Sequence, residues 1–128
     1  MKIEHVAIWA KDLELMKAFY AGNFGASVGA LHTEESGFQS YFLTFPSGSR
    51  LEIMSRQDIR ALPAFDGVER PGLSHLAFSV GSPEKVDAMT AKLVAEGRTL
   101  IRPPRPTPDG YYESCLLDPE GNPVEITA

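Results

Sequence analysis

The sequence is poor in cysteine and lacks long apolar runs, and each absence narrows the class of protein. Cys115 is the only cysteine, so no disulfide can form within the chain, and its strand-like flanks favour a buried small side chain over a reactive thiol. No apolar run approaches the roughly 20 residues that span a bilayer. Residues 2–6 are typical of a strand rather than of a signal peptide. We therefore expect a cytoplasmic protein without a membrane partner.

Positive charge is also scarce. The chain has 12 Lys and Arg residues against 17 Asp and Glu, with a formal net charge of −5. It shows no basic stripe, which argues against nucleic acid as a partner. The hydrophobic share of 43% and the charged share of 23% are typical of a globular protein and argue against disorder. A small molecule is therefore the expected partner.

The chain contains an internal repeat, which has to be identified before the fold is assigned. Residues 3–8 (IEHVAI) align with residues 73–78 (LSHLAF), matching His with His and Ala with Ala. Residues 45–53 (FPSGSRLEI) align with residues 118–126 (DPEGNPVEI), matching Pro, Gly, Glu and Ile. Both pairs of blocks follow at nearly the same offset and in the same order. The chain is therefore expected to hold two copies of one module.

Each copy has the pattern of a strand, a helix and three more strands. Asp12 and Ser82 are suited to be helix N-caps, each before an apolar stripe at helical spacing. Alternating segments predict strands at 3–9, 41–45, 50–54, 113–117 and 123–127, and weaker ones at 27–31 and 99–101. The sequence thus predicts an α+β fold of two βαβββ modules in tandem, forming a cupped mixed sheet with the helices on its outer face. We expect one domain over 1–128, with modules at about 1–55 and 73–128 and a linker at about 56–72.

Strand alternation places four polar residues on the sheet face away from the helices. Val6, Ile8 and their repeats must pack under the helices, so the opposite phase carries His5, Glu52, His75 and Glu125. Taken singly, each of these could be an ordinary surface group. As two equivalent His–Glu pairs brought together by pseudo-twofold pairing, they predict a site for one divalent ion such as Zn²⁺, Ni²⁺, Co²⁺, Mn²⁺ or Fe²⁺.

These motifs resemble those of the vicinal oxygen chelate superfamily, which includes glyoxalase I, extradiol dioxygenases and fosfomycin and bleomycin resistance proteins. The resemblance covers nearly the whole chain. It includes the His5 opening strand, the Phe19-Tyr20 helix end with Gly25 after it, and the turn 118–122 before Glu125. It implies the repeated βαβββ fold. The signal is specific for the superfamily and weak for any one substrate.

The His/Glu/His/Glu set resembles that of glyoxalase I. That resemblance implies a lyase or isomerase in which the metal holds adjacent substrate oxygens and stabilises an enediolate. It also implies that water completes the octahedral shell of the metal in the resting state. It implies that a carboxylate moves the proton, with Glu125 the first choice as base and Glu52 the second. Extradiol dioxygenases use a three-ligand set of two His and one carboxylate, and fosfomycin enzymes have a similar set. This chain differs from both because it has a second carboxylate, Glu52.

The resemblance also has departures that bear on the substrate. Trp9 stands where glyoxalase I enzymes commonly carry an Arg, and Arg56 where they commonly carry an Asn. Both departures argue against glutathione as co-substrate. Trp9 is expected to line an apolar subsite or to fill the bottom of the cup, and Arg56 to meet a substrate anion or remain solvated. His32 has no repeat partner and is expected in a surface loop.

Further substrate-binding residues are expected on the same face. Met54 follows Glu52 in phase. Residues 102–110, rich in Pro and Arg, are expected to form a stiff connector, or a lid that brings Arg102 or Arg105 to an anion. Tyr111 and Tyr112 lie on opposite faces of their strand, and Tyr112 is taken as the one that faces the substrate. The substrate-binding set is therefore Trp9, Met54, Arg56, Arg105 and Tyr112.

Two other functions stay open from the sequence. One is a metal-dependent dioxygenase or thiol transferase of the same superfamily, and the other is a non-catalytic binding or resistance protein. The resemblance implies a homodimer. It leaves open whether the metal site forms within one chain or across two, because superfamily members do both.

Overall fold

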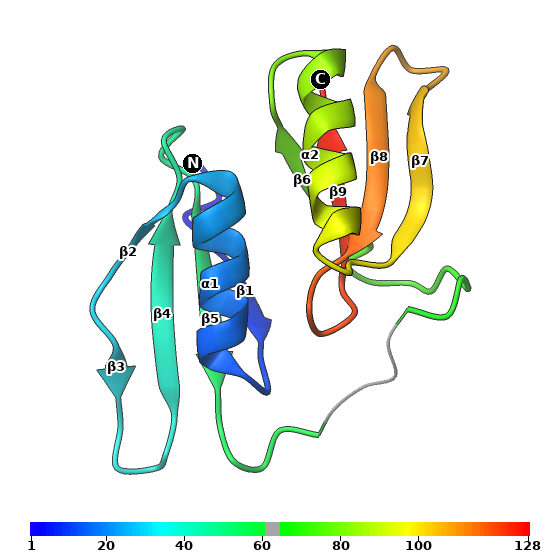
Figure 1. Cartoon of the computed structure of the whole chain (residues 1–128). Helices are drawn as coiled ribbons and strands as arrows, with labels where there is room; N and C mark the ends of the chain where they lie inside the picture. Colours follow the sequence, from blue (N-terminus) through cyan, green and yellow to red (C-terminus); the bar gives the residue numbers. More distant parts are fainter. Residues whose placement is uncertain (61–64) are drawn as a thin grey trace. The chain divides into compact units, whose positions relative to one another are not determined.

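The computed structural model describes residues 1–60 and 65–128 (Figure 1). The chain divides into two compact units, Met1–Leu62 and Pro63–Ala128, and each is described by itself. Part of the expected linker, residues 61–64, lies outside the described residues. No helix in the two described ranges is both long and apolar enough to cross a membrane.

The first unit is a mixed sheet with one helix. Its elements are β1 (Val6–Trp9), α1 (Leu13–Phe24), β2 (Ser27–Val28), β3 (His32–Thr33), β4 (Gln39–Thr44) and β5 (Arg50–Ser55). The strand order is β1-β5-β4-β2, and β3 also pairs with β4. β1 runs parallel to β5, whereas the other pairs are antiparallel. The opening strand therefore lies beside the closing strand.

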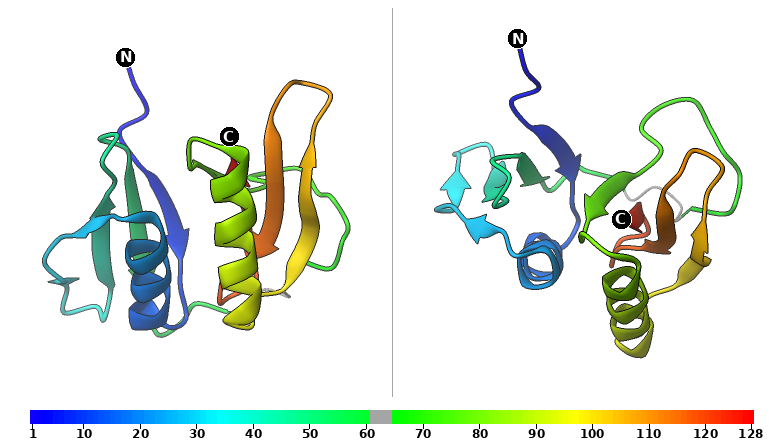
Figure 2. Two further views of the ribbon diagram at one scale, coloured as in Figure 1. Left: turned by 45° about the horizontal axis from the view of Figure 1, so that its top comes forward. Right: turned by 90° about the horizontal axis from the view of Figure 1, so that it is seen from above.

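The second unit repeats this arrangement. Its elements are β6 (Leu76–Ser79), α2 (Pro83–Ala95), β7 (Leu100–Pro106), β8 (Tyr112–Leu117) and β9 (Pro123–Thr127). The strand order is β6-β9-β8-β7, with β6 parallel to β9. Each helix covers one face of the sheet in its own unit (Figure 2). The predicted α+β fold of two βαβββ modules is thereby confirmed.

The helices begin and end where their capping residues predict. The Asp12 side chain accepts a hydrogen bond from the Leu15 backbone N–H, and Ser82 does the same for Lys85. These bonds satisfy N–H groups that have no partner within the first turn. Helix α1 ends at Gly25, whose φ of 69° is left-handed and suits a residue without a Cβ.

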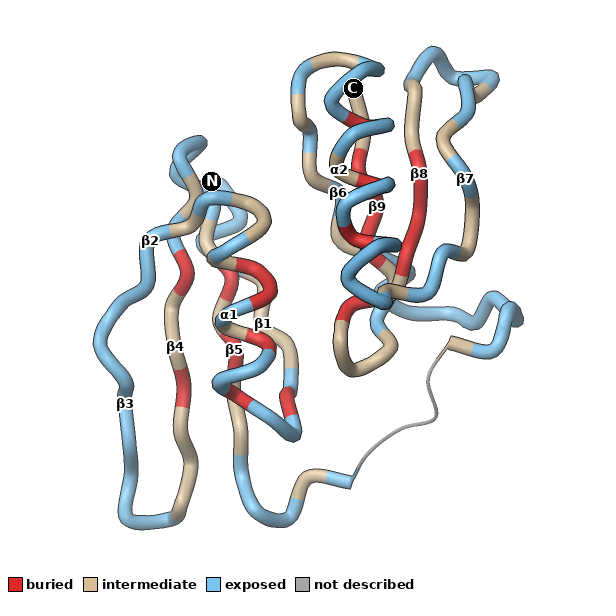
Figure 3. Tube along the Cα trace, in the orientation of Figure 1, coloured by how far each residue is buried: buried red, intermediate tan, exposed pale blue. Residues whose placement is uncertain are grey.

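The core of each unit lies between the helix and one face of its sheet (Figure 3). In the first unit Leu43, Leu51 and Ile53 are fully or almost fully buried against α1, together with Met16 and Tyr20 from the helix. The second unit is built the same way, and its buried side chains are Val86, Leu93, Leu116, Val124 and Ile126. The apolar phase of each strand therefore faces its helix, as the alternation predicts.

Two expectations need correction. The strand expected at 27–31 covers only Ser27–Val28 (β2), and a separate short strand, β3, follows at His32–Thr33, so exposed His32 lies in a strand and not in a loop. The segment expected as a connector or lid is strand over most of its length, because β7 runs to Pro106 and pairs with β8. Proline is tolerated there because β7 is an edge strand with two register shifts.

One register recurs in both units and positions the polar residues. Ala7 pairs with Glu52 across β1 and β5, and Ala77 pairs with Glu125 across β6 and β9. Each alanine lies two residues after a histidine, and residues two apart in an extended chain share a face. Each histidine is thereby directed to the same face as its glutamate, opposite the helix.

Candidate metal centre

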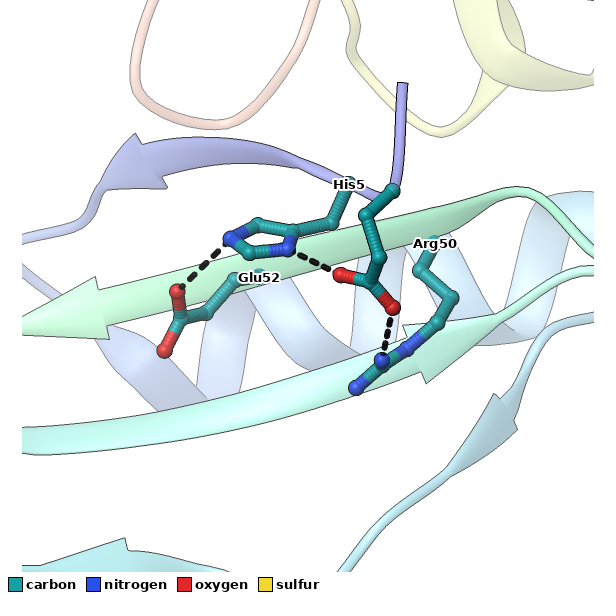
Figure 4. Close-up of polar contacts among 4 residues, drawn as sticks. His5, Arg50 and Glu52 are labelled. Carbon is teal, nitrogen blue, oxygen red and sulfur yellow. Dashed lines mark hydrogen bonds and ion pairs between the residues drawn. The ribbon is translucent and has the colours of Figure 1, made fainter. Parts of the chain in front are cut away.

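The first His–Glu pair lies at the start of the parallel strand pair of unit one. His5 directly precedes β1, and Glu52 lies inside β5. The His5 Nε2 atom is 3.6 Å from Glu52 Oε2 (Figure 4). The imidazole also meets the Phe42 ring edge-on, with 5.2 Å between centroids. Its Nε2 atom therefore points along the sheet face toward the carboxylate.

The other nitrogen of His5 has a carboxylate partner of its own. His5 Nδ1 hydrogen-bonds to Glu4, and Arg50 donates to the second oxygen of Glu4 (Figure 4). The hydrogen bond from His5, followed by that from Arg50, lowers the pKa of Glu4 below its ordinary value. Glu4 therefore stays ionised near neutral pH and acts as an acceptor on both sides.

The second pair is closer and more deeply buried. His75 Nε2 is 3.0 Å from Glu125 Oε2, and Glu125 is only 7% exposed. The other oxygen of Glu125 accepts a hydrogen bond from Arg102 at 2.9 Å. On the far side of the ring, His75 Nδ1 is 3.2 Å from the Ser74 hydroxyl. Both oxygens of Glu125 are therefore held, one by an imidazole and one by a guanidinium.

Within each pair, the separation of the imidazole nitrogen and the carboxylate oxygen fits two ligands of one cation. Two N or O ligands about 2.1 Å from one metal lie roughly 3.0 to 3.4 Å apart at octahedral to tetrahedral angles. The 3.0 Å pair meets this range and the 3.6 Å pair needs only a slight closure. Within residues 1–60 and 65–128, no three His, Cys, Asp or Glu side chains gather as a metal site. Each unit thus supplies two ligands of the type that borderline divalent metals prefer.

The surroundings of the two glutamates differ. Glu52 pairs with Phe42 on the neighbouring strand β4. Glu125 pairs with Cys115 on β8, and Cys115 in turn pairs with Arg102 on β7. The Thr127 hydroxyl, two residues beyond Glu125 and in the same phase, is a buried group without a hydrogen-bond partner. The second unit therefore offers a cation and an unused hydroxyl beside its carboxylate, and the first offers an aromatic ring.

The expected substrate-binding residues of the first unit lie in phase with the His–Glu pair. Trp9 pairs with Met54 across β1 and β5, two residues along each strand from the Ala7–Glu52 pair. Trp9 is 42% exposed, and the Arg56 guanidinium lies 5.5 Å from the centroid of its ring. Arg56 also forms an ion pair with Asp58. Trp9 and Met54 thus form an apolar stretch beside the pair, and Arg56 already has a carboxylate partner.

The two expected substrate-binding residues of the second unit, Tyr112 and Arg105, lie on different faces of its sheet. The Tyr112 hydroxyl donates to Asp87 of α2 at 2.9 Å, so this ring is on the helix side of the sheet. Arg105 is exposed on the edge strand β7, opposite Glu113. Tyr112 therefore points away from the His75–Glu125 pair, whereas Arg105 pairs with a residue in the same phase as Cys115 and Glu125.

Three residues around the pairs were not in the predicted set of site residues. Arg50 and Glu52 are two apart in one strand, so alternation already placed Arg50 on this face. Arg102 was considered only as part of a lid. Glu4 gave no signal, because alternation over the expected strand 3–9 assigns it to the phase opposite to His5. The outer contacts of both pairs were therefore found from the structure.

The sequence of the chain matches a known family over almost its full length. The model of the Glyoxalase/Bleomycin resistance protein/Dioxygenase superfamily matches residues 2–126. The chain therefore belongs to this superfamily, which confirms the resemblance drawn from the repeated motifs.

Relatives and solved structures agree with this assignment. The chain is 32% identical to the uncharacterized protein YqjT of Bacillus subtilis (strain 168), covering 98% of both chains. It is 31% identical to a glyoxalase family protein from Enterococcus faecalis, with a TM-score of 0.77 over 99% of this chain and 97% of that one. The fosfomycin resistance protein FosX of Listeria monocytogenes, solved with Mn(II), is 22% identical with a TM-score of 0.72 over 98% and 90%. That last likeness shows the fold alone.

Cys115 should be nearly inert in the folded protein. Burial raises the pKa of its thiol to about 11, and the side chain is only 1% exposed. Because the thiolate is the reactive form, the raised pKa alone should slow alkylation at pH 8 about 100-fold relative to the unfolded chain. The rate of iodoacetamide labelling, followed by mass spectrometry with and without denaturant, measures this ratio. Equal rates would show that the thiol is accessible.

Proposed function

We propose that this protein is a metal-dependent lyase or isomerase of glyoxalase type, which transfers a proton on a small oxygenated substrate chelated to one divalent ion. His5, Glu52, His75 and Glu125 hold the ion, which is Zn, Ni, Co, Mn or Fe. The observation that carries the proposal is the repeated His–Glu pair, built at the same register in both units. Superfamily membership supports it, as does Mn(II) in the FosX structure.

The two carboxylates have separate tasks in this proposal. When bound, the metal supplies a Lewis acid that stabilises negative charge on the substrate oxygens. Glu125 removes and returns the proton, and Glu52 is the second choice for this role. Arg102 donates a hydrogen bond to Glu125 Oε1, so the carboxylate stays in the site when its Oε2 atom leaves the ion to act as the base. Burial of Glu125 limits access of bulk water to the base.

The first unit gives the substrate an apolar wall. Trp9 and Met54 lie beside the His5–Glu52 pair and suit an alkyl or aromatic part of the substrate. Arg56 is paired with Asp58 and stacks near Trp9, which leaves it less available for an anionic group. Glutathione is not part of the proposal, since the positions that would favour it carry Trp9 and Arg56.

Metal content is the first test of the proposal. Protein purified without chelator or affinity metal should contain about one divalent ion per chain, because each chain supplies one set of four ligands. Removing an imidazole ligand in His5→Ala should abolish stoichiometric binding, because the remaining ligands satisfy the ion poorly. Elemental mass spectrometry measures the content, and the Co²⁺ spectrum reports the ligand field. The matched control is His32→Ala, whose imidazole is exposed beside Glu34 and should leave binding unchanged.

Two results would contradict the metal site. Wild-type protein that takes up no ion after reloading with each metal would favour a binding protein without catalytic metal. A His5→Ala variant that binds metal with unchanged affinity would remove His5 from the site. Bound Fe²⁺ together with consumption of O₂ on a catechol would instead favour the dioxygenase alternative.

The role of Glu125 is tested by an isosteric change. Glu125→Gln keeps the shape and one oxygen but removes the base, so proton transfer should slow by about 10²- to 10⁴-fold. Exchange of carbon-bound hydrogen for solvent deuterium in a panel of α-hydroxycarbonyl compounds measures this by NMR. Glu52→Gln should slow exchange less, and Glu34→Gln, at an exposed position outside both His–Glu pairs, serves as the control. Full exchange by a metal-loaded, folded Glu125→Gln variant would remove its assigned role.

Mixing two inactive variants decides whether the ligands come from one chain or two. In the proposed homodimer, His5→Ala and Glu125→Gln damage different units. If each site joins units of two chains, refolding an equal mixture should restore about a quarter of the wild-type sites, because half of the dimers are mixed and each regains one site. Sites within one chain give no recovery. Metal content and deuterium exchange of the mixture against each variant alone provide the measurement.

A further inference from the structure

The two histidines of the repeated pairs differ in what holds their outer nitrogen. His5 Nδ1 bonds to Glu4, which is held in turn by Arg50. His75 Nδ1 instead meets the hydroxyl of Ser74, which takes the place of Glu4 in the second repeat, and Pro123 takes the place of Arg50. The outer contact of the first histidine is therefore a feature of this unit and not of the repeated scaffold.

The contact with Glu4 fixes where the proton of a neutral His5 ring lies. An ionised carboxylate has no hydrogen to donate, so the neutral imidazole must carry its proton on Nδ1. Its Nε2 atom then keeps a free lone pair, directed to the side where Glu52 Oε2 lies 3.6 Å away. A lone pair on Nε2 is what a metal ligand at this position needs.

His75 has the opposite bias in the metal-free protein. Its Nε2 atom lies within hydrogen-bonding distance of the Glu125 carboxylate, which can only accept. The Ser74 hydroxyl on the other side can donate to Nδ1 or accept from it. The neutral His75 ring therefore carries its proton on Nε2. The two histidines of one chain are expected to show opposite tautomers.

The Glu4 contact is part of a closed group of four side chains. Arg50, which binds Glu4, also lies over the Phe42 ring at 4.0 Å from its centroid. Phe42 in turn meets the edge of the His5 ring. Arg50 and Phe42 are anchored in the paired strands β5 and β4. A single exposed ion pair is worth little, but here the imidazole is contacted by Phe42, which lies in the sheet, and by Glu4, which is held by Arg50 of the sheet.

We propose that Glu4, held by Arg50, is a positioning residue for His5 that sets both the tautomer and the orientation of its ring for metal binding. The metal part of this inference rests on the proposed function. The tautomer part concerns the metal-free chain and stands apart from it. Neither Glu4 nor Arg50 contacts the ion or the substrate in this proposal.

The tautomers can be read directly by long-range ¹⁵N–¹H NMR of metal-free, full-length protein labelled at histidine. At about pH 8.5 unperturbed imidazoles are neutral. Wild-type protein should show His5 protonated on Nδ1 and His75 on Nε2. Glu4→Ala should move His5 toward Nε2, the tautomer favoured in free imidazole side chains, while His75 stays unchanged as an internal reference. Glu4→Gln should largely retain the Nδ1 tautomer, because its amide oxygen still accepts.

Metal affinity gives the second readout, through competition of Co²⁺ or Zn²⁺ with a chromophoric chelator. Glu4→Ala should weaken binding about 10- to 100-fold, the usual effect of losing an outer hydrogen bond to a metal-bound histidine. Glu4→Gln should recover most of it. Glu34→Ala removes the equivalent exposed contact at His32 and should change neither readout, which controls for loss of a surface charge.

The outcomes separate this inference from the proposed function. An unchanged His5 tautomer in Glu4→Ala overturns the inference whether or not the protein binds metal. A shifted tautomer with undiminished affinity in a metal-binding protein also overturns it. If the wild type binds no metal yet Glu4→Ala shifts the tautomer, the positioning role stands and the proposed function fails.

Discussion

The parallel pairing of the opening and closing strands is the constraint on which the site depends. It joins β1 to β5 and β6 to β9 at one register, so that Ala7 faces Glu52 and Ala77 faces Glu125. The helix that connects each opening strand to the rest of its unit covers the other face and takes up the apolar phase. The polar phase has no helix to pack against. In each unit, the packing of the helix on one face of the sheet therefore buries the core and leaves an imidazole and a carboxylate together on the other face.

The repeated scaffold has acquired different surroundings in its two copies. In the first, an aromatic ring lies across from Glu52 and a carboxylate–guanidinium pair stands behind His5. In the second, Arg102 holds Glu125 and a hydroxyl stands behind His75. A duplicated module with equal ligands would give two equivalent carboxylates. These differences support the proposal that the two carboxylates have different tasks. Glu125 is held by the Arg102 guanidinium, whereas Glu52 lies beside an apolar wall.

Local rules predicted most of the fold because local interactions decide it. The N-caps at Asp12 and Ser82 and the left-handed Gly25 fix the helix ends through hydrogen bonds within a few residues. The rules failed where neighbours in space matter more. The proline-rich segment after residue 101 became strand because an edge position needs no N–H on its outer side. Tyr112 lies on the helix side of its sheet, where its hydroxyl bonds to Asp87. The face on which each β8 side chain lies is set by the pairing of β8 with its neighbouring strands and not by the sequence of β8 alone.

The sequence by itself determined the repeated module, the superfamily, and the phase that puts His5, Glu52, His75 and Glu125 on one kind of face. Alternation and repetition are encoded residue by residue, so they can be read without a structure. Only the tertiary structure decided which side chains contact these two His–Glu pairs from outside. Glu4 is the neighbour of His5 in the chain, but alternation assigns it to the opposite phase, and Arg50 and Arg102 contact Glu4 and Glu125 from other strands. Contacts between segments far apart in the chain form when sheets assemble, and no local pattern records them.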